Sequence, residues 1–375
     1  MTASDSPASP TAVIAANSGW NIVNFRKPVI QALRDHGWRV VALAPDDGSA
    51  AAIRSLGAGF EPIAIDSSGT SVGRDSRLLL NYLRFLHALR PQLFLGFTAK
   101  PNIYGSLAAA MLGIRVVNNI SGLGTAFLRP GPLSWLVSGL YRLALRKSAR
   151  VFFQNPHDLD LFVRKRLVRP GQARLLPGSG IDLAHFRPQP MPDEIGGVFR
   201  FLFVGRLLRD KGLVEYAEAA RLLLPRWPNV EFAILGFAGS DNRSAVPIGE
   251  VERWQAEGIV TYLGETDDVR EHIAQAHCIV LPSYREGLPR VLLEAAATAR
   301  PMVATDVPGC RDVVRDGDTG LLCEARSPQA LAAAMEAMLR LDRQERAAMG
   351  ARARQMVERD FDQALVAAAY AEALT

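Results

Sequence analysis

Apolar and polar segments alternate along this chain in a regular order. Short apolar runs end in loops rich in glycine, proline or polar residues, and segments with apolar residues at helical spacing follow them. The first such group runs from apolar residues 11–16, through the periodic segment 25–36, to apolar residues 38–44. Buried parallel strands joined by crossover helices produce this order. The pattern therefore predicts an α/β protein.

The alternation occurs twice, on either side of a segment rich in proline and glycine at residues 187–197, which is typical of an interdomain linker. In the first series we expect further strands at 60–65, 92–97, 115–120, 150–154 and 174–177, and helices at 77–89, 103–112 and 131–148. In the second we expect strands at 201–204, 230–235, 259–263, 277–281 and 301–305, and late helices at 327–341, 343–358 and 362–374. A length of 375 residues suits two domains.

Composition narrows the class of protein. An apolar fraction of 49% supports sizeable cores, and no run approaches the ~20 apolar residues of a membrane helix. Residues 1–10 have no basic start and no apolar core, so we interpret them as a flexible tail and not as a secretory signal. The three cysteines form no CxxC pair, which favours free thiols in a reducing cytoplasm.

Charge is distributed unevenly along the chain. Residues 1–187 carry 22 Lys and Arg against 10 Asp and Glu, a net +12, whereas the remainder carries 21 against 28, a net −7. Residues 76–157 contain no acidic side chain at all. This asymmetry predicts an anionic partner for the N-terminal half: a phosphorylated substrate, a membrane surface or nucleic acid. Nucleic acid is disfavoured because no recognition module accompanies the charge.

The predicted helix 131–148 is rich in leucine and aromatic residues, has cations and lacks acids. Two interpretations are equally open. The helix lies on a membrane surface, or it is a core helix with a solvated basic edge.

The segment 284–294 contains two carboxylates, Glu286 and Glu294, between a predicted buried strand and a predicted helix. Gly287 would let a ligand approach the backbone, and Pro289 suits the first helical turn. The free N–H groups of Arg290 and Val291 could then meet an anion. We expect Glu294 about two turns inside the helix, so that the carboxylates reach different parts of one ligand.

Cations occur at another strand end of the same domain, in Gly205-Arg206 and Lys211-Gly212. Cations beside a helix start form a site for a diphosphate, because both neutralise its oxygens. Carboxylates accept hydrogen bonds from hydroxyl groups. A ligand with a diphosphate and several hydroxyls is a sugar nucleotide.

The pattern Gly205-Arg206, Lys211-Gly212 and Glu286-x7-Glu294 resembles the retaining glycosyltransferases of family 4, which have the GT-B fold of two Rossmann-like α/β/α domains facing a cleft. Further matches include residues 17–26, Lys100 to Tyr104, Ser121 to Gly124, Gly236 and Gly264. The N-terminal loops most resemble the bacterial enzymes that extend polyprenyl-diphosphate-linked oligosaccharides, such as N-acetylgalactosaminyltransferases. The resemblance implies an acceptor-binding domain at 11–187, a donor-binding domain at 188–360 and a last helix, 361–375, that crosses back to the first domain.

The resemblance also implies roles for individual residues. Arg206 and Lys211 would hold the donor diphosphate, Glu286 the sugar hydroxyls and Glu294 the ribose hydroxyls. We count Arg206, Lys211 and Glu286 as catalytic. The remaining donor-binding residues would be Asn17, Ser18, Gly19, Gly205, Gly236, Gly287, Leu288, Arg290, Val291 and Glu294, and the acceptor side would include Lys100, Asn102, Ser121 and Gly122. We do not assign Glu286 the role of a nucleophile.

Two further features concern the chemistry. Ser121 stands where many members of the family have a histidine, which leaves the handling of the acceptor proton open. Asp158 and Asp160 form a DxD pattern, which in other sugar transferases holds a metal ion, but we interpret it as a solvated helix face. We therefore expect neither a metal nor a cofactor, because Arg206 and Lys211 supply the positive charge.

The sequence thus predicts a metal-independent, retaining transferase that moves a hexose or N-acetylhexosamine from a UDP-sugar to a polyprenyl-diphosphate-linked saccharide. It would work in the cytoplasm at the inner face of the cell membrane, in bacterial polysaccharide assembly. The alternatives are a transferase with a soluble acceptor, a nucleotide-sugar epimerase, and a non-catalytic subunit that binds sugar nucleotides.

Overall fold

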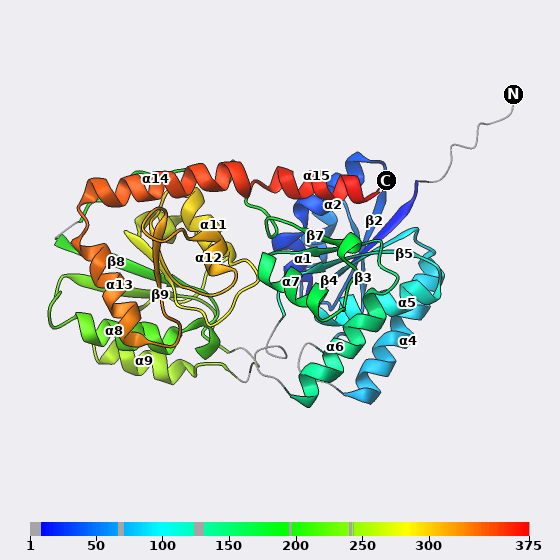
Figure 1. Cartoon of the computed structure of the whole chain (residues 1–375), viewed down its shortest axis with the longest axis horizontal. Coiled ribbons are helices and arrows are strands. Elements are labelled where there is room, and N and C mark those ends of the chain that lie inside the picture. Colours follow the sequence, from blue (N-terminus) through cyan, green and yellow to red (C-terminus); the bar gives the residue numbers. More distant parts are fainter. Residues whose placement is uncertain are drawn as a thin grey trace, which may run out of the picture. The chain divides into compact units, whose positions relative to one another are not determined.

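The computed structural model describes residues 9–66, 71–123, 131–194, 197–239, 242 and 244–374. Contacts within the chain divide it into two units (Figure 1). Unit 1 comprises Met1–Ser179 with Gln363–Thr375, and unit 2 comprises Gly180–Asp362. Each unit is built on a parallel sheet with helices on both faces, which confirms the predicted α/β class with two Rossmann-like domains.

Unit 1 contains a seven-stranded sheet in the order β3-β2-β1-β4-β5-β6-β7, with every pairing parallel. Its strands are β1 (Thr11–Ala15), β2 (Arg39–Ala44), β3 (Gly59–Pro62), β4 (Leu93–Phe97), β5 (Arg115–Ile120), β6 (Arg150–Phe153) and β7 (Ala173–Leu175). Its helices are α1 (Gly19–Phe25), α2 (Lys27–Asp35), α3 (Ala50–Ser55), α4 (Val72–Leu89), α5 (Ser106–Met111), α6 (Pro132–Leu145), α7 (Pro156–Arg164) and α15 (Gln363–Leu374), with a π-helical turn η1 (Pro101–Gly105) and a 3-10 turn η3 (Pro170–Gln172).

The two faces of this sheet are covered by different helices. Residues 12 and 14 of β1 pack with α2 and α15, whereas residues 13 and 15 pack with α4 and α5. Because side chains alternate across a strand, one strand serves both cores. The last helix is held in unit 1 by Tyr370, whose ring lies 4.8 Å from that of Phe152 and whose hydroxyl accepts a hydrogen bond from Asn119.

Unit 2 contains a six-stranded parallel sheet in the order β10-β9-β8-β11-β12-β13. Its strands are β8 (Phe199–Val204), β9 (Val230–Leu235), β10 (Thr261–Tyr262), β11 (Cys278–Leu281), β12 (Met302–Thr305) and β13 (Gly320–Cys323). Its helices are α8 (Leu213–Leu223), α9 (Ile248–Ala256), α10 (Arg270–Gln275), α11 (Arg290–Ala297), α12 (Cys310–Val313), α13 (Pro328–Arg340) and α14 (Arg343–Asp360), with a 3-10 turn η5 (Arg209–Lys211). Strands β9, β8, β11 and β12 are neighbours, so the loops that follow them share one edge.

Some expectations need correction. The segment 187–197 is not a free linker, because its described residues are bound to unit 2. The Arg300 guanidinium donates hydrogen bonds to the carbonyls of Gln189 and Pro190, and Arg346 forms an ion pair with Glu194. The change of unit therefore falls at residues 179–180. Of the expected tail, residues 1–8 lie outside the described residues. Helices α1, α3, α9, α10 and α12 and strand β13 were not expected.

None of the helices in the described parts of the chain is both long enough and apolar enough to cross a membrane.

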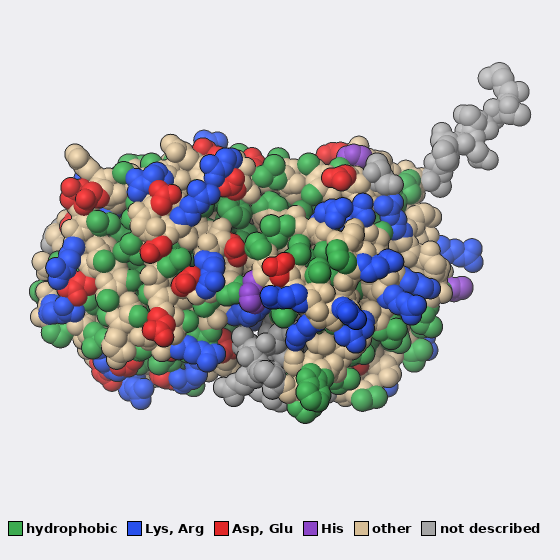
Figure 2. Space-filling view, viewed as in Figure 1, with side chains coloured by type: hydrophobic (Ala, Val, Ile, Leu, Met, Phe, Trp, Pro, Cys, Tyr) green, Lys and Arg blue, Asp and Glu red, His purple; other side chains and the backbone are tan. Residues whose placement is uncertain are grey.

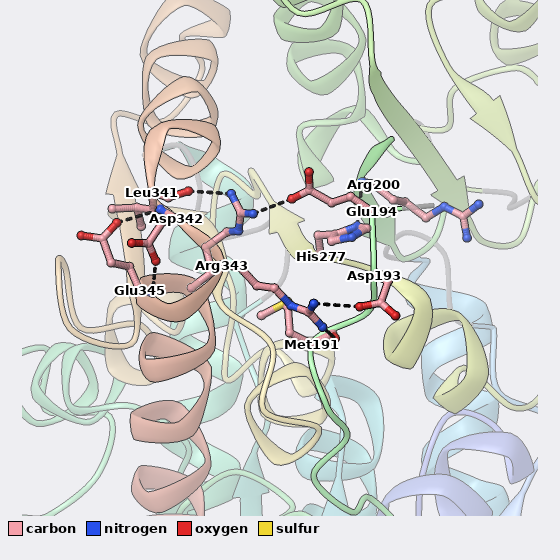
Figure 3. A network of polar contacts seen from close by, with 10 residues as sticks. Met191, Asp193, Glu194, Arg200, His277, Leu341, Asp342, Arg343 and Glu345 are labelled. Atoms are coloured by element: carbon pink, nitrogen blue, oxygen red, sulfur yellow. Dashed lines mark hydrogen bonds and ion pairs between the residues drawn. The ribbon is translucent and has the colours of Figure 1, made fainter. Parts of the chain in front are cut away.

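A buried histidine lies beside the segment that was expected to be a linker (Figure 3). His277 stacks on Phe199, with ring centroids 4.8 Å apart, and its Nδ1 accepts a hydrogen bond from the Arg200 amide. Its Nε2 is buried and has no partner among the described residues. Burial, together with the nearby guanidinium groups of Arg346 and Arg300, lowers the pKa of His277 to about 4.

This histidine predicts a pH dependence of stability. Because the pKa is lower in the folded than in the unfolded chain, the unfolded chain binds more protons between pH 4 and pH 6.5. The free energy of unfolding should fall by about 2 kcal/mol from pH 7 to pH 5 through this group. Denaturant titrations at both pH values measure the loss, and His277→Gln should reduce it. An equal loss in the variant would contradict this assignment.

Candidate active site

The loops at the carboxyl edge of the unit 2 sheet pack backbone against backbone. A Cβ atom on Gly236, which follows β9, would lie 1.8 Å from the carbonyl oxygen of Gly205, which follows β8. A Cβ atom on Gly212 would lie 2.0 Å from the carbonyl oxygen of Pro282. Gly212 also has a φ of +73°, which disfavours side chains. These glycines bring the loops after β8, β9 and β11 into contact.

The ion pair between Lys211 and Glu286 joins two of the predicted catalytic residues, which are 75 positions apart in the sequence. Lys211 ends the turn η5 after β8, and Glu286 lies in the loop after β11, so the adjacency of these strands brings them together. The hydroxyl of Ser283 donates a second hydrogen bond to the same oxygen, Glu286 Oε1, at 2.6 Å. Among the described residues, Oε2 has no protein partner and can accept hydrogen bonds from a ligand.

The loop that carries Glu286 is anchored on several sides. Thr305 at the end of β12 donates a hydrogen bond to the Ser283 carbonyl, and the Glu286 amide donates to the Pro308 carbonyl at 3.2 Å. The Tyr284 hydroxyl donates a hydrogen bond to Glu215 of α8 at 2.6 Å, and the Tyr284 amide donates one to the Asp210 carbonyl at 2.9 Å. Burial and the Glu215 carboxylate raise the pKa of Tyr284. These bonds fix the carboxylate of Glu286 before any ligand arrives.

Glu294 lies on the helix that follows this loop. Pro289 is the residue before the helix and Arg290 is its first residue, so Glu294 lies about one turn inside α11, and not two as expected. The residue is 9% exposed, and its carboxylate accepts a hydrogen bond from Arg290 Nε at 2.8 Å. Burial raises the pKa of Glu294, although Arg290 acts in the opposite direction. Leu288, Arg290 and Val291 are partly exposed beside it.

Arg206 is not part of this contact network. It follows β8 directly and its side chain is exposed, and within the described residues the structure gives its guanidinium no hydrogen bond or ion pair. It is therefore available to an anion, but no protein contact fixes its position.

A cavity of about 560 Å³ lies beside α11, and the hydrophobic pattern did not predict it. Its walls include His185, Asp268, Arg270, Glu271 and Thr298. His185 and Asp268 also act electrostatically on Glu294, and the Thr298 amide bonds to the Glu294 carbonyl at 3.0 Å.

In unit 1, the loop after β1 and the start of α1 contain Asn17, Ser18 and Gly19, which the resemblance assigns to donor binding. The Ser18 hydroxyl accepts a hydrogen bond from the Asn21 amide, and Asp47 accepts one from the Trp20 amide at 3.0 Å. These two amides are therefore occupied within the chain. The Asn17 amide donates to Thr98 Oγ1, and a Cβ atom on Gly19 would lie 2.7 Å from Asp47, so this glycine is required by packing.

The four residues expected on the acceptor side have different environments. Lys100 forms an ion pair with the buried Asp75 at 2.8 Å, and Ser121 lies between the Arg26 guanidinium and Asn119. Gly122 follows Ser121 at the end of β5. The prediction for Asn102 needs correction, because this residue is buried and hydrogen-bonded to Asn118 and to the Asn119 carbonyl. Asn102 therefore holds the sheet edge together and is not available to a ligand. Burial and Asp75 also raise the pKa of Tyr104 to about 12.

The DxD pattern needs a second correction. Asp160 is exposed, as expected, but Asp158 is fully buried. Its amide donates to the Asn155 side chain at 2.8 Å, and Asn155 Nδ2 donates back to the Asp158 carboxylate. The two residues cap the start of α7. In the described part of the chain, no group of three or more His, Cys, Asp or Glu residues could hold a metal ion.

Comparisons with known proteins agree with this architecture. A sequence model for the glycosyl transferase 4-like domain matches residues 27–178, and one for glycosyl transferases group 1 matches residues 198–341. The N,N'-diacetylbacillosaminyl-diphospho-undecaprenol alpha-1,3-N-acetylgalactosaminyltransferase of Campylobacter jejuni is 26% identical over 344 residues, 86% of this chain and 88% of that protein. The UDP-Gal:alpha-D-GlcNAc-diphosphoundecaprenol alpha-1,3-galactosyltransferase of Escherichia coli is 23% identical, over 68% of each chain.

Solved structures show the same fold. The Anabaena HepE protein, in complex with UDP and glucose, superposes with a TM-score of 0.79 at 18% identity, over 97% of this chain and 99% of that chain. The sucrose-phosphate synthase of Thermosynechococcus elongatus gives a TM-score of 0.77 at 18% identity, over 97% of this chain and 98% of that one. These matches and the two parallel sheets confirm the GT-B fold. The two sequence models together span most of the chain. The chain therefore belongs to the glycosyltransferases, with an N-terminal glycosyl transferase 4-like domain and a C-terminal domain of glycosyl transferases group 1.

Proposed function

We propose that this protein transfers a hexose or N-acetylhexosamine from a UDP-sugar to a saccharide linked to a polyprenyl diphosphate, with retention of the anomeric configuration. The reaction belongs to the assembly of a bacterial surface polysaccharide or glycan and takes place at the inner face of the cell membrane. The observation that carries the proposal is the joined pair Lys211 and Glu286, with Glu294 on the next helix.

The proposed donor site follows from the chemistry of these groups. Lys211 neutralises the diphosphate, and Arg206 reaches the same anion from its exposed position. The unpartnered oxygen of Glu286 accepts a hydrogen bond from a hydroxyl of the transferred sugar. The carboxylate of Glu294 accepts hydrogen bonds from the ribose hydroxyls. Because His185 and Asp268 act on Glu294 and line the adjacent cavity, a nucleoside held by Glu294 would place its base at that cavity.

The proposed reaction needs no metal ion. As the bond between the sugar and the diphosphate breaks, negative charge grows on the leaving phosphate, and Lys211 and Arg206 stabilise it. The acceptor hydroxyl attacks from the same face, and its proton passes to the leaving phosphate. Full activity in the presence of a chelator tests the absence of a metal.

The proposed acceptor rests on the names of the relatives and on the charge of unit 1. Both relatives named above act on sugars linked to a diphosphate of undecaprenol, according to their names. In this chain, the long stretch without acidic residues offers positive charge to such a diphosphate, whereas the ammonium group of Lys100 is already paired with Asp75.

Glu294→Gln is expected to weaken donor binding more than catalysis. The amide keeps the size of the side chain but accepts hydrogen bonds from ribose hydroxyls less strongly than a carboxylate. Because the ribose does not change during the reaction, KM for the donor should rise about tenfold while kcat stays within about threefold. Initial rates over a range of donor concentrations measure both. A large fall in kcat at an unchanged KM would contradict the assigned role.

The direct test of function uses labelled UDP-sugars with a polyprenyl-diphosphate-linked saccharide in detergent. Transfer of label to the lipid, with an α-linked product from an α-linked donor, supports the proposal. Full activity on a soluble sugar without transfer to the lipid would favour the soluble-acceptor alternative. Donor binding without any turnover would favour a non-catalytic subunit.

A further inference from the structure

Helix α6 has two apolar faces, and only one of them is covered. Val137, Tyr141 and Leu145 are buried against the rest of unit 1. On the other side, the exposed fractions are 76% for Trp135, 54% for Leu136 and 59% for Leu143. A helix that is apolar on all sides normally lies in a protein core or in contact with lipid. Large apolar side chains gathered on a surface indicate an interaction site.

This surface, here called the α6 face, consists of Leu133, Trp135, Leu136, Leu143, Arg146 and Lys147. Leu133, Leu136 and Leu143 recur at helical spacing, and Arg146 and Lys147 follow the helix and are exposed. In Figure 2, exposed apolar side chains lie where α6 begins. The apolar residues are thus concentrated at the start of the helix and the cations at its end.

Helix α4 extends the surface. Its first residue, Val72, is 87% exposed, and Leu80, Arg77 and Arg84 are exposed further along it. Helices α4 and α6 both contact the turn η1, and α5 contacts each of them, so the three form one layer on the sheet. The layer offers apolar side chains and cations together.

Charge decides between the possible partners of this surface. Residues 76–157 contain no acidic side chain, and Figure 2 shows Lys and Arg side chains gathered over unit 1. A second copy of the chain would bring a similar basic surface against this one, and like charges repel. An anionic bilayer attracts the cations and also accepts the leucine and tryptophan side chains.

We propose that the α6 face and the start of α4 dock this protein on an anionic lipid bilayer. Trp135, Leu136 and Leu143 enter the headgroup region, and Arg146 and Lys147 lie against anionic headgroups. Both helices begin at the carboxyl edge of the sheet, where Lys100 and Ser121 also lie. Docking there brings this edge of the sheet to the depth at which a lipid-linked diphosphate is found. The link between docking and the acceptor rests on the proposed function.

Sedimentation of the full chain with vesicles tests the docking without donor or acceptor. Vesicles of phosphatidylcholine with phosphatidylglycerol should bind the protein, and vesicles of phosphatidylcholine alone should bind it much less. Leu136→Asn with Leu143→Asn should weaken binding at least tenfold, and Arg146→Gln with Lys147→Gln should weaken it by about fivefold per cation. Leu222→Asn, at an exposed leucine of unit 2, is the matched control and should bind normally.

Three results would overturn the proposal. They are no binding of the wild type to anionic vesicles, equal binding by the α6-face variants, and a dimer in light scattering that these variants dissociate. Thermal melts confirm that each variant is folded. Transfer to an acceptor with a short, water-soluble prenyl chain separates docking from catalysis. With this acceptor, the transfer rates of the α6-face variants should match that of the wild type. A wild type that is inactive on every acceptor would refute the proposed function, and the vesicle result would still stand.

Discussion

Replacing Lys211 by alanine is expected to lower kcat about a thousandfold. Lys211 ends the turn η5 after β8, with its ammonium group against Glu286, where the diphosphate leaving group would gain negative charge. Removing one preorganised group of this kind commonly costs a factor of about 10² to 10³ in kcat. The side chain is 25% exposed and its loss opens no core cavity, so the midpoint of thermal unfolding should change little. Initial rates at saturating donor measure the effect.

Arg209→Ala is the matched control for this variant. Arg209 lies in the same turn, η5, and forms an exposed ion pair with Glu250 at 2.7 Å, away from the Glu286 carboxylate. The Arg209→Ala variant loses the same kind of charge from the same turn and should retain most of the activity. If Lys211→Ala kept more than a tenth of the wild-type kcat, the diphosphate would have to be stabilised by other groups.

Replacing Glu286 by glutamine is expected to lower kcat about a hundredfold. The change keeps the shape of the side chain and the acceptor for the Ser283 hydroxyl, but it removes the charge that pairs with Lys211 and that would bind the sugar in the proposed function. Because the sugar becomes positively charged as the donor bond breaks, loss of a nearby carboxylate should lower kcat more than it raises KM.

Glu250→Gln is the corresponding control, since it neutralises an ion-paired carboxylate near the same edge of unit 2. Its kinetics should match those of the wild type. A Glu286→Gln variant with unchanged kcat and a raised KM would show that Glu286 only binds the donor. The epimerase and binding-subunit alternatives both require sugar transfer to be absent in the wild type as well.

The sequence predicted the architecture well because hydrophobic periodicity reports burial directly. Strands β1, β2, β4 and β5 and helices α13 to α15 lie close to where their apolar patterns indicated. Most of the missed elements are short. Helix α3 has six residues, of which only Ile53 is buried, and β13 has four residues after a turn. Such segments are stabilised by tertiary contacts, which leave little periodic signal in the sequence.

Polar residues were harder to place than apolar ones. Asn102 and Asp158 both looked available to ligands or solvent, yet both are buried. Asn102 is bonded to Asn118 of β5, and Asp158 is bonded to Asn155 at the start of its own helix. Buried polar groups are nearly always hydrogen-bonded, but the partner is known only once the fold is known. The meeting of Lys211 and Glu286 followed from the adjacency of their strands, whereas the cavity beside Glu294 depends on loops that no pattern identified.

A crystal structure of this protein with UDP tests the central claim most directly. The account predicts that the diphosphate contacts the ammonium group of Lys211 and that the ribose hydroxyls donate to Glu294, with Glu286 left facing the position of the sugar. Isothermal titration with Lys211→Ala should then show at least tenfold weaker binding of UDP. A nucleotide bound elsewhere, with neither Lys211 nor Glu294 in contact, would contradict the account.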